Sequence, residues 1–213
     1  LILARALGQL GDTERALERL SLVQAQGQGT PASAEALRLA FSLRHPDVSA
    51  ELDAVMRAAE DADLADLPTI GARAHHIAFT HEVWTAHYAL GITEKRQGRM
   101  ATALRCFEAA IASARGATPA YIEASAAALQ RRDNAKAITF AEGALALEPD
   151  NAVAYAALAR SQSAAGLHEP ARASITRALA LAPNNAAFVA LQERIQNPQM
   201  GLLEKLKAKF KPR

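Results

Sequence analysis

A nearly identical phrase occurs twice in this chain, with the second copy 34 residues after the first. Residues 144–158 read ALALEPDNAVAYAAL, and residues 178–191 read ALALAPNNAAFVAL. Self-similarity at such a period is the signature of proteins built from stacked supersecondary units. A unit of this length cannot bury its apolar face alone, so neighbouring units must pack together. The repeat therefore predicts an array of stacked units.

The residues inside the repeat predict that each unit consists of two short helices. Half of the residues of the chain are hydrophobic but only 5% are aromatic, and the dominant Ala and Leu are strong helix formers. Pro149 and Pro183 would end the second helix of a unit, because proline lacks an N–H and clashes with the preceding turn. The Asp and Asn residues that follow suit a turn and the next N-cap. Because period-2 strand patterns are scarce, we predict an all-α chain.

The spacing of small and large residues resembles the tetratricopeptide repeat, a helix–turn–helix unit. The segment 84–115 matches best, at Leu90, Gly91, Gly98, Ala103, Phe107 and Ala110. The segment 152–185 matches at Tyr155, Leu158, Ala159, Gly166, Ala171, Ile175, Ala178 and Pro183. The segment 118–151 departs from the pattern at Arg132, where a turn glycine is usual. The resemblance extends over 81–196, is partial over 1–27, and retains few signature positions over 31–80.

This resemblance implies that residues 1–196 form a right-handed superhelical α-solenoid of stacked repeats. The pattern over 31–64 predicts helices at 32–44 and 48–61. Residues 65–80 lie outside the repeat register and are either an irregular insertion or a helix extension. We favour one long helix that begins near Thr69 and reaches Gln97. The predicted units are 1–30, 31–64, 81–117, 118–151 and 152–185, followed by a capping helix at 186–196 in which Phe188 and Leu191 face the stack.

Solenoids of this family bind peptides or proteins in a concave groove lined by first-helix residues, so the resemblance implies such a groove here. The predicted groove residues are Tyr88, Ile92, Lys95, Ile122, Ala126, Leu129, Ala156, Arg160 and Ser163. An alternative is that some of these side chains pack within the stack. Some family members grip a C-terminal carboxylate with paired Lys and Asn, and that clamp is absent from the matching pairs: Tyr88/Ile92, Ile122/Ala126 and Ala156/Arg160. The groove is therefore predicted to suit a helix or extended segment with aliphatic anchors.

The sequence contains no constellation that predicts catalysis, a metal site or a cofactor. The segment HEVWTAH at 81–87 fails the zinc-protease pattern, because Thr85 stands where the second histidine is required. His76 and His87 would be roughly 16 Å apart on a continuous helix, too far to share an ion. We interpret the histidines as surface and inter-helix residues. Cys106, the only cysteine, is interpreted as a small buried hydrophobe, since no motif pairs it with a base.

The segment 197–213, which ends in GLLEKLKAKFKPR, differs in character from the repeats. It predicts a basic amphipathic helix that binds an anionic membrane surface or a partner. The alternative is a terminal helix that packs its leucines on the last repeat. The residues predicted to act are the apolar Leu202, Leu203, Leu206 and Phe210 and the basic Lys205, Lys207, Lys209 and Lys211.

We predict from these features a non-enzymatic scaffold or adaptor, cytoplasmic and bacterial, that binds a protein or peptide partner. Peripheral attachment to a membrane and homo-oligomerisation are further predictions. A formal net charge of +2 argues against nucleic acid as the partner. Two alternatives stay open. One is the recognition arm of a protein-modifying transferase with its catalytic part upstream of Leu1, and the other is a peripheral envelope-assembly factor that docks through the tail.

Overall fold

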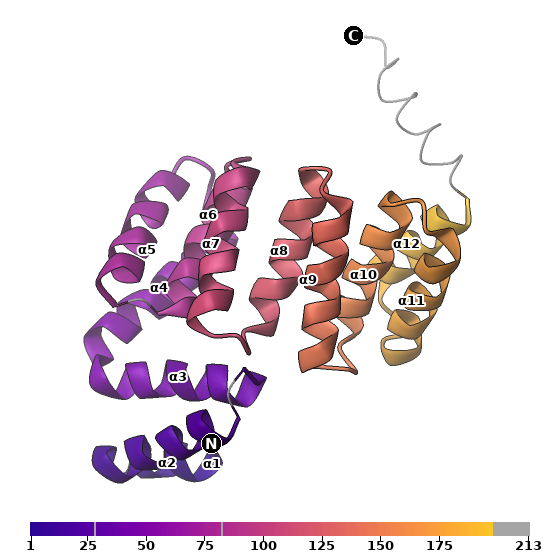
Figure 1. The fold of residues 1–213 in the computed structure, drawn as a ribbon. Coiled ribbons are helices and arrows are strands. Elements are labelled where there is room, and N and C mark those ends of the chain that lie inside the picture. Colours follow the sequence, from indigo (N-terminus) through magenta and orange to yellow (C-terminus); the bar gives the residue numbers. More distant parts are fainter. Residues whose placement is uncertain (28, 82, 198–213) are drawn as a thin grey trace.

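The computed structural model describes residues 1–27, 29–81 and 83–197, and these residues form helices and short connections without a strand (Figure 1). The predicted all-α solenoid fold is confirmed. The first helices α6, α8, α10 and α12 begin 34 residues apart, and so do the second helices α7, α9 and α11. The helix bounds are α1 (Ile2–Gln9), α2 (Thr13–Gln26), α3 (Pro31–Arg44), α4 (Pro46–Asp61), α5 (Leu67–His81), α6 (Trp84–Arg96), α7 (Met100–Ser113), α8 (Thr118–Gln130), α9 (Asn134–Leu147), α10 (Ala152–Ala164), α11 (His168–Leu181) and α12 (Ala186–Gln196).

The regular part of the stack consists of the hairpins α6/α7, α8/α9 and α10/α11, followed by α12. Each first helix packs against its own second helix and against the second helix of the preceding unit. Buried alanines fill these contacts, because small side chains let helix backbones approach closely. Gly91 shows how close the approach is, since a Cβ at this position would overlap the Phe107 ring.

Asparagine side chains begin the last two first helices of the stack. The Asn151 side chain accepts a hydrogen bond from the backbone N–H of Ala154 at 3.0 Å. The Asn185 side chain accepts hydrogen bonds from the N–H groups of Ala187 and Phe188. Each cap satisfies N–H groups that have no partner inside the helix. The Pro-Asx-Asn phrase thus ends one helix and starts the next.

Residues 65–80 contribute to a separate helix, and the prediction of one long helix from Thr69 to Gln97 is wrong. Helix α5 ends at His81 and α6 begins at Trp84, after Val83 has taken an extended conformation with φ −84° and ψ 130°. The apolar stripe of α5 packs against α4 and α6. The break lets α5 and α6 pack against each other, and burial of apolar surface favours this arrangement.

Helices α3 and α4 are both present near their predicted positions, but they do not pack as a hairpin. They meet near their junction, and α4 packs mainly against α5 and α6. His45 joins them directly as the C-cap of α3 and the N-cap of α4, with φ −136°. Pro46 disfavours helical geometry in the residue before it, and a one-residue connection is too short for the chain to reverse. The chain therefore bends here.

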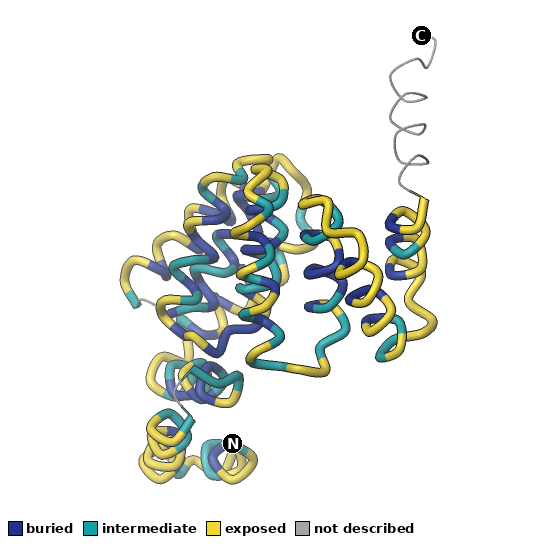
Figure 2. Tube along the Cα trace, turned by 45° about the vertical axis from the view of Figure 1, so that its right-hand side comes forward, coloured by how far each residue is buried: buried dark blue, intermediate teal, exposed yellow. Residues whose placement is uncertain are grey.

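The bend directs α1, α2 and α3, which we call the N-terminal layer, beneath α4 to α7 at the lower left of Figure 1. The indole N–H of Trp84 donates a hydrogen bond to the Ala34 carbonyl at 3.2 Å. Ala34 is buried in one cluster with alanines of α7, α8 and their connection. At Gly116 the chain passes so close to the Thr30 carbonyl that a Cβ would overlap it. Buried residues line the inside of both parts, and exposed residues their outer surface (Figure 2).

Candidate peptide-binding face

The predicted groove residues lie on α6, α8 and α10, and their accessible surface is called the first-helix face below. Two of the nine residues do not belong to it. Ile92 is only 8% exposed and Ala156 only 1% exposed, so neither can serve as a main contact for a partner. Ile92 packs in the core formed by α4 to α9, and Ala156 packs in the core beneath α12. For these two residues the prediction of an accessible groove position is wrong, and the alternative of packing within the stack holds.

The part of the face on α6 is already occupied by contacts within the protein. Tyr88 is half-buried, with its ring 6.4 Å from the Trp84 ring and 5.9 Å from the Phe107 ring. Burial raises the pKa of Tyr88, and the carboxylates of Glu123 and Glu60 raise it further. The Lys95 ammonium lies 2.6 Å from the Glu123 carboxylate, so this charge is paired. These partners leave α6 few free groups for a ligand.

Helix α8 contributes an aliphatic stripe that is only half covered. Ile122, Ala126 and Leu129 are four and three residues apart, so they share one side of the helix. All three are half-buried. Ile122 packs on its inner side against residues of α9 and α10, and Leu129 packs against the main core. Their outer sides remain accessible to an apolar ligand.

Helix α10 places an unpaired positive charge on the next unit of the same face. The Arg160 side chain is exposed and forms no hydrogen bond or ion pair with any residue of the described chain. Ser163 is half-buried on the same helix. An exposed guanidinium can form paired hydrogen bonds with a carboxylate. Together, α8 and α10 therefore offer aliphatic contacts beside one cationic contact.

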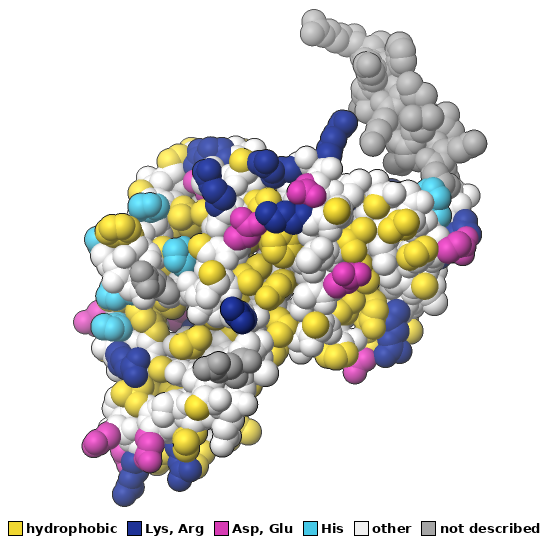
Figure 3. Space-filling view, in the orientation of Figure 1, with side chains coloured by type: hydrophobic (Ala, Val, Ile, Leu, Met, Phe, Trp, Pro, Cys, Tyr) yellow, Lys and Arg dark blue, Asp and Glu magenta, His cyan; other side chains and the backbone are white. Residues whose placement is uncertain are grey.

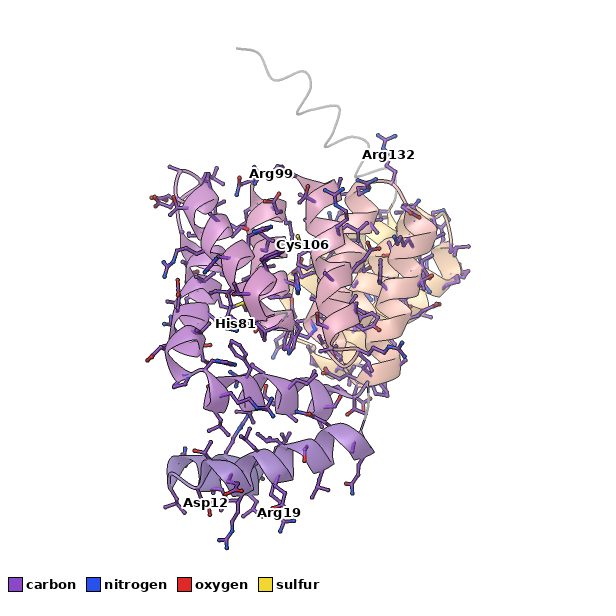
Figure 4. All side chains as sticks on the ribbon, turned by 60° about the vertical axis from the view of Figure 1, so that its left-hand side comes forward. Asp12, Arg19, His81, Arg99, Cys106 and Arg132 are labelled. Carbon is purple, nitrogen blue, oxygen red and sulfur yellow. The ribbon has the colours of Figure 1, made fainter. Side chains whose placement is uncertain are left out.

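Two further exposed arginines, Arg131 and Arg132, stand where α8 turns into α9, and our sequence analysis did not include them among the groove residues. Neither side chain has a hydrogen bond or ion pair within the described residues. Arg132 projects from the same edge of the stack as Arg99 (Figure 4). The sequence signal for these two arginines is Arg132 itself, which stands at a position where the other turns have glycine.

The opposite face, formed largely by second helices, has a different distribution of side chains. Figure 3 shows apolar side chains across its middle and most of the Lys, Arg, Asp and Glu side chains near its upper and lower edges. Several of these charges are paired locally, as in Arg172–Glu169 on α11 and Arg177–Asp150. Histidines gather at the flank next to α5 (Figure 3). This face is therefore a poorer candidate for a charged ligand.

The histidines and the cysteine do not form a reactive site in the described part of the chain. No group of three or more His, Cys, Asp or Glu residues there has metal-binding geometry. The His45 and His81 rings are 4.9 Å apart and pack with Phe41 at the bend between α3 and α4. Burial raises the pKa of the Cys106 thiol to about 11, so the nucleophilic thiolate is disfavoured at neutral pH.

The predicted tail residues, from Leu202 to Lys211, lie outside the described residues, as does most of the 197–213 segment. Their binding to a membrane or partner therefore stays a prediction. Within the described ranges, no helix combines the length and the apolar character needed to span a bilayer.

Comparison with known proteins identifies the class of this fold. The family model described as tetratricopeptide repeat matches residues 128–195, from α8 into α12. The predicted resemblance to the tetratricopeptide repeat is thereby confirmed for residues 128–195. Comparison with curated protein sequences finds no match.

Solved structures, two of them described as tetratricopeptide-repeat proteins or domains, share the fold at low sequence identity. YrrB, described as having an unusual peptide-binding site, is 12% identical with a TM-score of 0.56, covering 89% of this chain and 88% of its own. A MamA fragment from Desulfovibrio magneticus is 14% identical with a TM-score of 0.58, covering 78% and 98%. The second repeat domain of human RPAP3, solved with an HSP70 peptide, is 19% identical with a TM-score of 0.50, covering 58% and 98%. These similarities show the fold.

Proposed function

We propose that this protein is a non-enzymatic scaffold or adaptor that binds a protein or peptide partner on its first-helix face. The observation that carries the proposal is the half-covered stripe of Ile122, Ala126 and Leu129 beside the unpaired Arg160. Apolar surface that stays accessible between helices of a solenoid favours association with an amphipathic segment. YrrB and RPAP3, which share the fold, are described as binding peptides, and this supports the same class of ligand here.

Ala126 provides the sharpest test of the face. Replacing the half-buried Ala126 by Glu places a charge in the middle of the aliphatic stripe without removing a large core side chain. Affinity capture from a lysate of the source organism, read by quantitative mass spectrometry, should recover fewer specific partners with Ala126→Glu than with the unchanged protein. A buried charge at an apolar contact is expected to weaken binding by roughly tenfold or more.

Ala109 supplies the matched control, because it is also half-buried but lies on the second helix α7. Ala109→Glu should capture the same partners as the unchanged protein. Far-UV circular dichroism and thermal unfolding establish that both variants keep the fold. If Ala126→Glu retains all partners, or if Ala109→Glu loses them instead, the binding face is not the one proposed.

A further inference from the structure

The connection between α8 and α9 is the same turn as in three other hairpins, but it contains an arginine where they contain glycine. The equivalent residues are Gly11, Gly98, Arg132 and Gly166, with φ values of 82°, 79°, 63° and 79°. In each turn this residue donates its N–H to the carbonyl three positions back, and the next residue donates to the carbonyl five positions before itself. The backbone is therefore equivalent in all four, and only the side chain differs.

Arg132 gains no internal contact that would offset this conformation. A residue with a Cβ is disfavoured at positive φ, and glycine is not. Among the described residues, Arg132 is the one non-glycine residue with a positive φ. Its side chain is nevertheless exposed and unpaired. A Cβ at Gly98 or Gly166 would meet nothing within 4 Å, so packing does not demand glycine or arginine at this point of the turn. This turn therefore differs from the other three in the exposed guanidinium that it presents to solvent.

The preceding hairpin contains an arginine one position later in its turn, and this arginine is neutralised within the unit. Arg99 follows the turn glycine of α6/α7 and forms two hydrogen bonds with the buried carboxylate of Glu94, at 2.6 and 2.7 Å. In the α8/α9 unit, the position equivalent to Glu94 is Ala128, 34 residues later. No carboxylate therefore reaches Arg132 from within its own unit by this route.

The other charged groups around this turn leave a positive site. Arg131 is exposed and unpaired beside Arg132. Asp133 accepts the Lys136 backbone N–H at 3.1 Å as the N-cap of α9. The Lys136 ammonium is paired with Glu108 of the neighbouring α7. Two unpaired guanidiniums are thus next in sequence to a single carboxylate that already caps a helix, and this arrangement suits a carboxylate supplied from outside.

We propose that Arg131 and Arg132 bind acidic side chains of a peptide whose aliphatic residues lie on the α8 stripe. The stripe of Ile122, Ala126 and Leu129 leads along α8 to this turn, and Leu129 precedes Arg132 by less than one helical turn. The partner is therefore an amphipathic segment with aliphatic anchors followed or preceded by Asp or Glu. This inference rests on the proposed function and adds the charge of the ligand to it.

A selection of random peptides displayed on phage tests the ligand class without a known partner. Peptides selected on the unchanged protein should contain aliphatic residues and a clear excess of Asp and Glu over the unselected library. Peptides selected on the Arg131→Ala/Arg132→Gly double variant should keep the aliphatic residues and lose the acidic excess. If no peptide is selected on the unchanged protein, both the proposed function and this inference fail. If selected peptides carry no acidic excess, only this inference fails.

Fluorescence anisotropy with the best selected peptide then measures the contribution of the two arginines. The double variant should bind roughly tenfold more weakly at about 50 mM salt, and the difference should shrink at about 300 mM. Arg105→Ala is the matched control, because Arg105 is exposed on the second helix α7, and it should bind like the unchanged protein. Equal affinity of the double variant would overturn the inference. Tighter binding of a single-stranded oligothymidylate than of the peptide would also overturn it, in favour of a phosphate ligand.

Thermal unfolding separates a binding role from a structural one. Arg132→Gly should raise the unfolding midpoint by about 2–4 °C, because glycine relieves the positive-φ strain, and should weaken binding of the selected peptide at the same time. A lower midpoint would show that Arg132 stabilises the turn, and it would overturn the argument that the side chain serves a ligand.

Discussion

At the scale of a single residue, close packing at Gly91 explains why glycine stands in the Leu-Gly pair of the best-matching repeat. The Phe107 ring of the second helix fills the space that a Cβ at Gly91 would occupy. Phe107 is itself fully buried, so the ring cannot move into solvent. This glycine therefore serves to allow the close approach of α6 and α7, and it does not form a turn.

We expect Gly91→Ala to destabilise the protein although alanine is the better helix former. The added methyl would overlap a buried ring, and overpacking of a core typically costs about 1–3 kcal/mol, more than the gain in helix propensity of about 1 kcal/mol. Urea unfolding followed by circular dichroism measures the change. In the double variant with Phe107→Leu, the Gly91→Ala substitution should lower the free energy of unfolding by less than it does alone. If the two substitutions have purely additive effects on this free energy, there is no direct clash.

Cys106 links burial of one thiol to the pH dependence of stability. Its pKa is raised to about 11 in the folded protein, mainly by burial, from an ordinary value of 9.0. The unfolded chain therefore loses this proton at a lower pH than the folded chain, so stability should fall as the pH rises from about 9 toward 11. The free energy of unfolding, measured at pH 8 and pH 10.5, should decrease less in Cys106→Ala than in the unchanged protein. An equal decrease in both proteins would contradict the assignment.

At the scale of elements, local sequence signals placed most helices but not their partners. The Asn caps lie next to the helix starts that they determine, and the 34-residue period repeats these starts along the chain, so α7 to α12 could be predicted from the sequence. The break between α5 and α6 could not, because no proline or glycine marks it and Val83 takes its extended conformation in a packed environment. Tertiary packing decided this boundary.

The N-terminal layer depends on contacts made by single residues far apart in the sequence. We expect Trp84→Phe to loosen α1 to α3, because phenylalanine keeps most of the ring but loses the N–H bond to the Ala34 carbonyl. The loss of one such bond is about 1 kcal/mol. Hydrogen–deuterium exchange should become faster in residues 2–44 and stay unchanged in α9 to α11. Uniform acceleration across the chain would show that the layer does not open separately.

At the scale of the whole molecule, the stack is held by contacts between neighbouring units. Helix α12 buries Phe188, Leu191 and Ile195 against α10 and α11. In such an array, stability is the sum of the units and their interfaces, so a defect at one end should act mainly on its neighbours.

We therefore expect Phe188→Ala to destabilise the C-terminal end alone. The loss of a buried phenylalanine costs about 3–5 kcal/mol in a closed core. Here hydrogen–deuterium exchange should rise in α10 to α12 and remain unchanged in α4 to α7. Val189→Ala is the control, because Val189 is on the same helix but 39% exposed, and it should change little. Loss of protection throughout the chain would indicate a single cooperative core instead of a stack.

The sequence by itself determined the repeat unit, its two helices and their caps, because these depend on residues a few positions apart. The tertiary structure decided which sides of the helices stay accessible. Ile92 occupies the same repeat position as Ala126 and Arg160, and Ala156 lies one helical turn before Arg160. Both Ile92 and Ala156 are nevertheless buried, because neighbouring helices cover them. The extended conformation of Val83 likewise depends on how α5 and α6 pack together. Periodicity specifies which face of a helix is apolar, whereas only packing specifies what covers it.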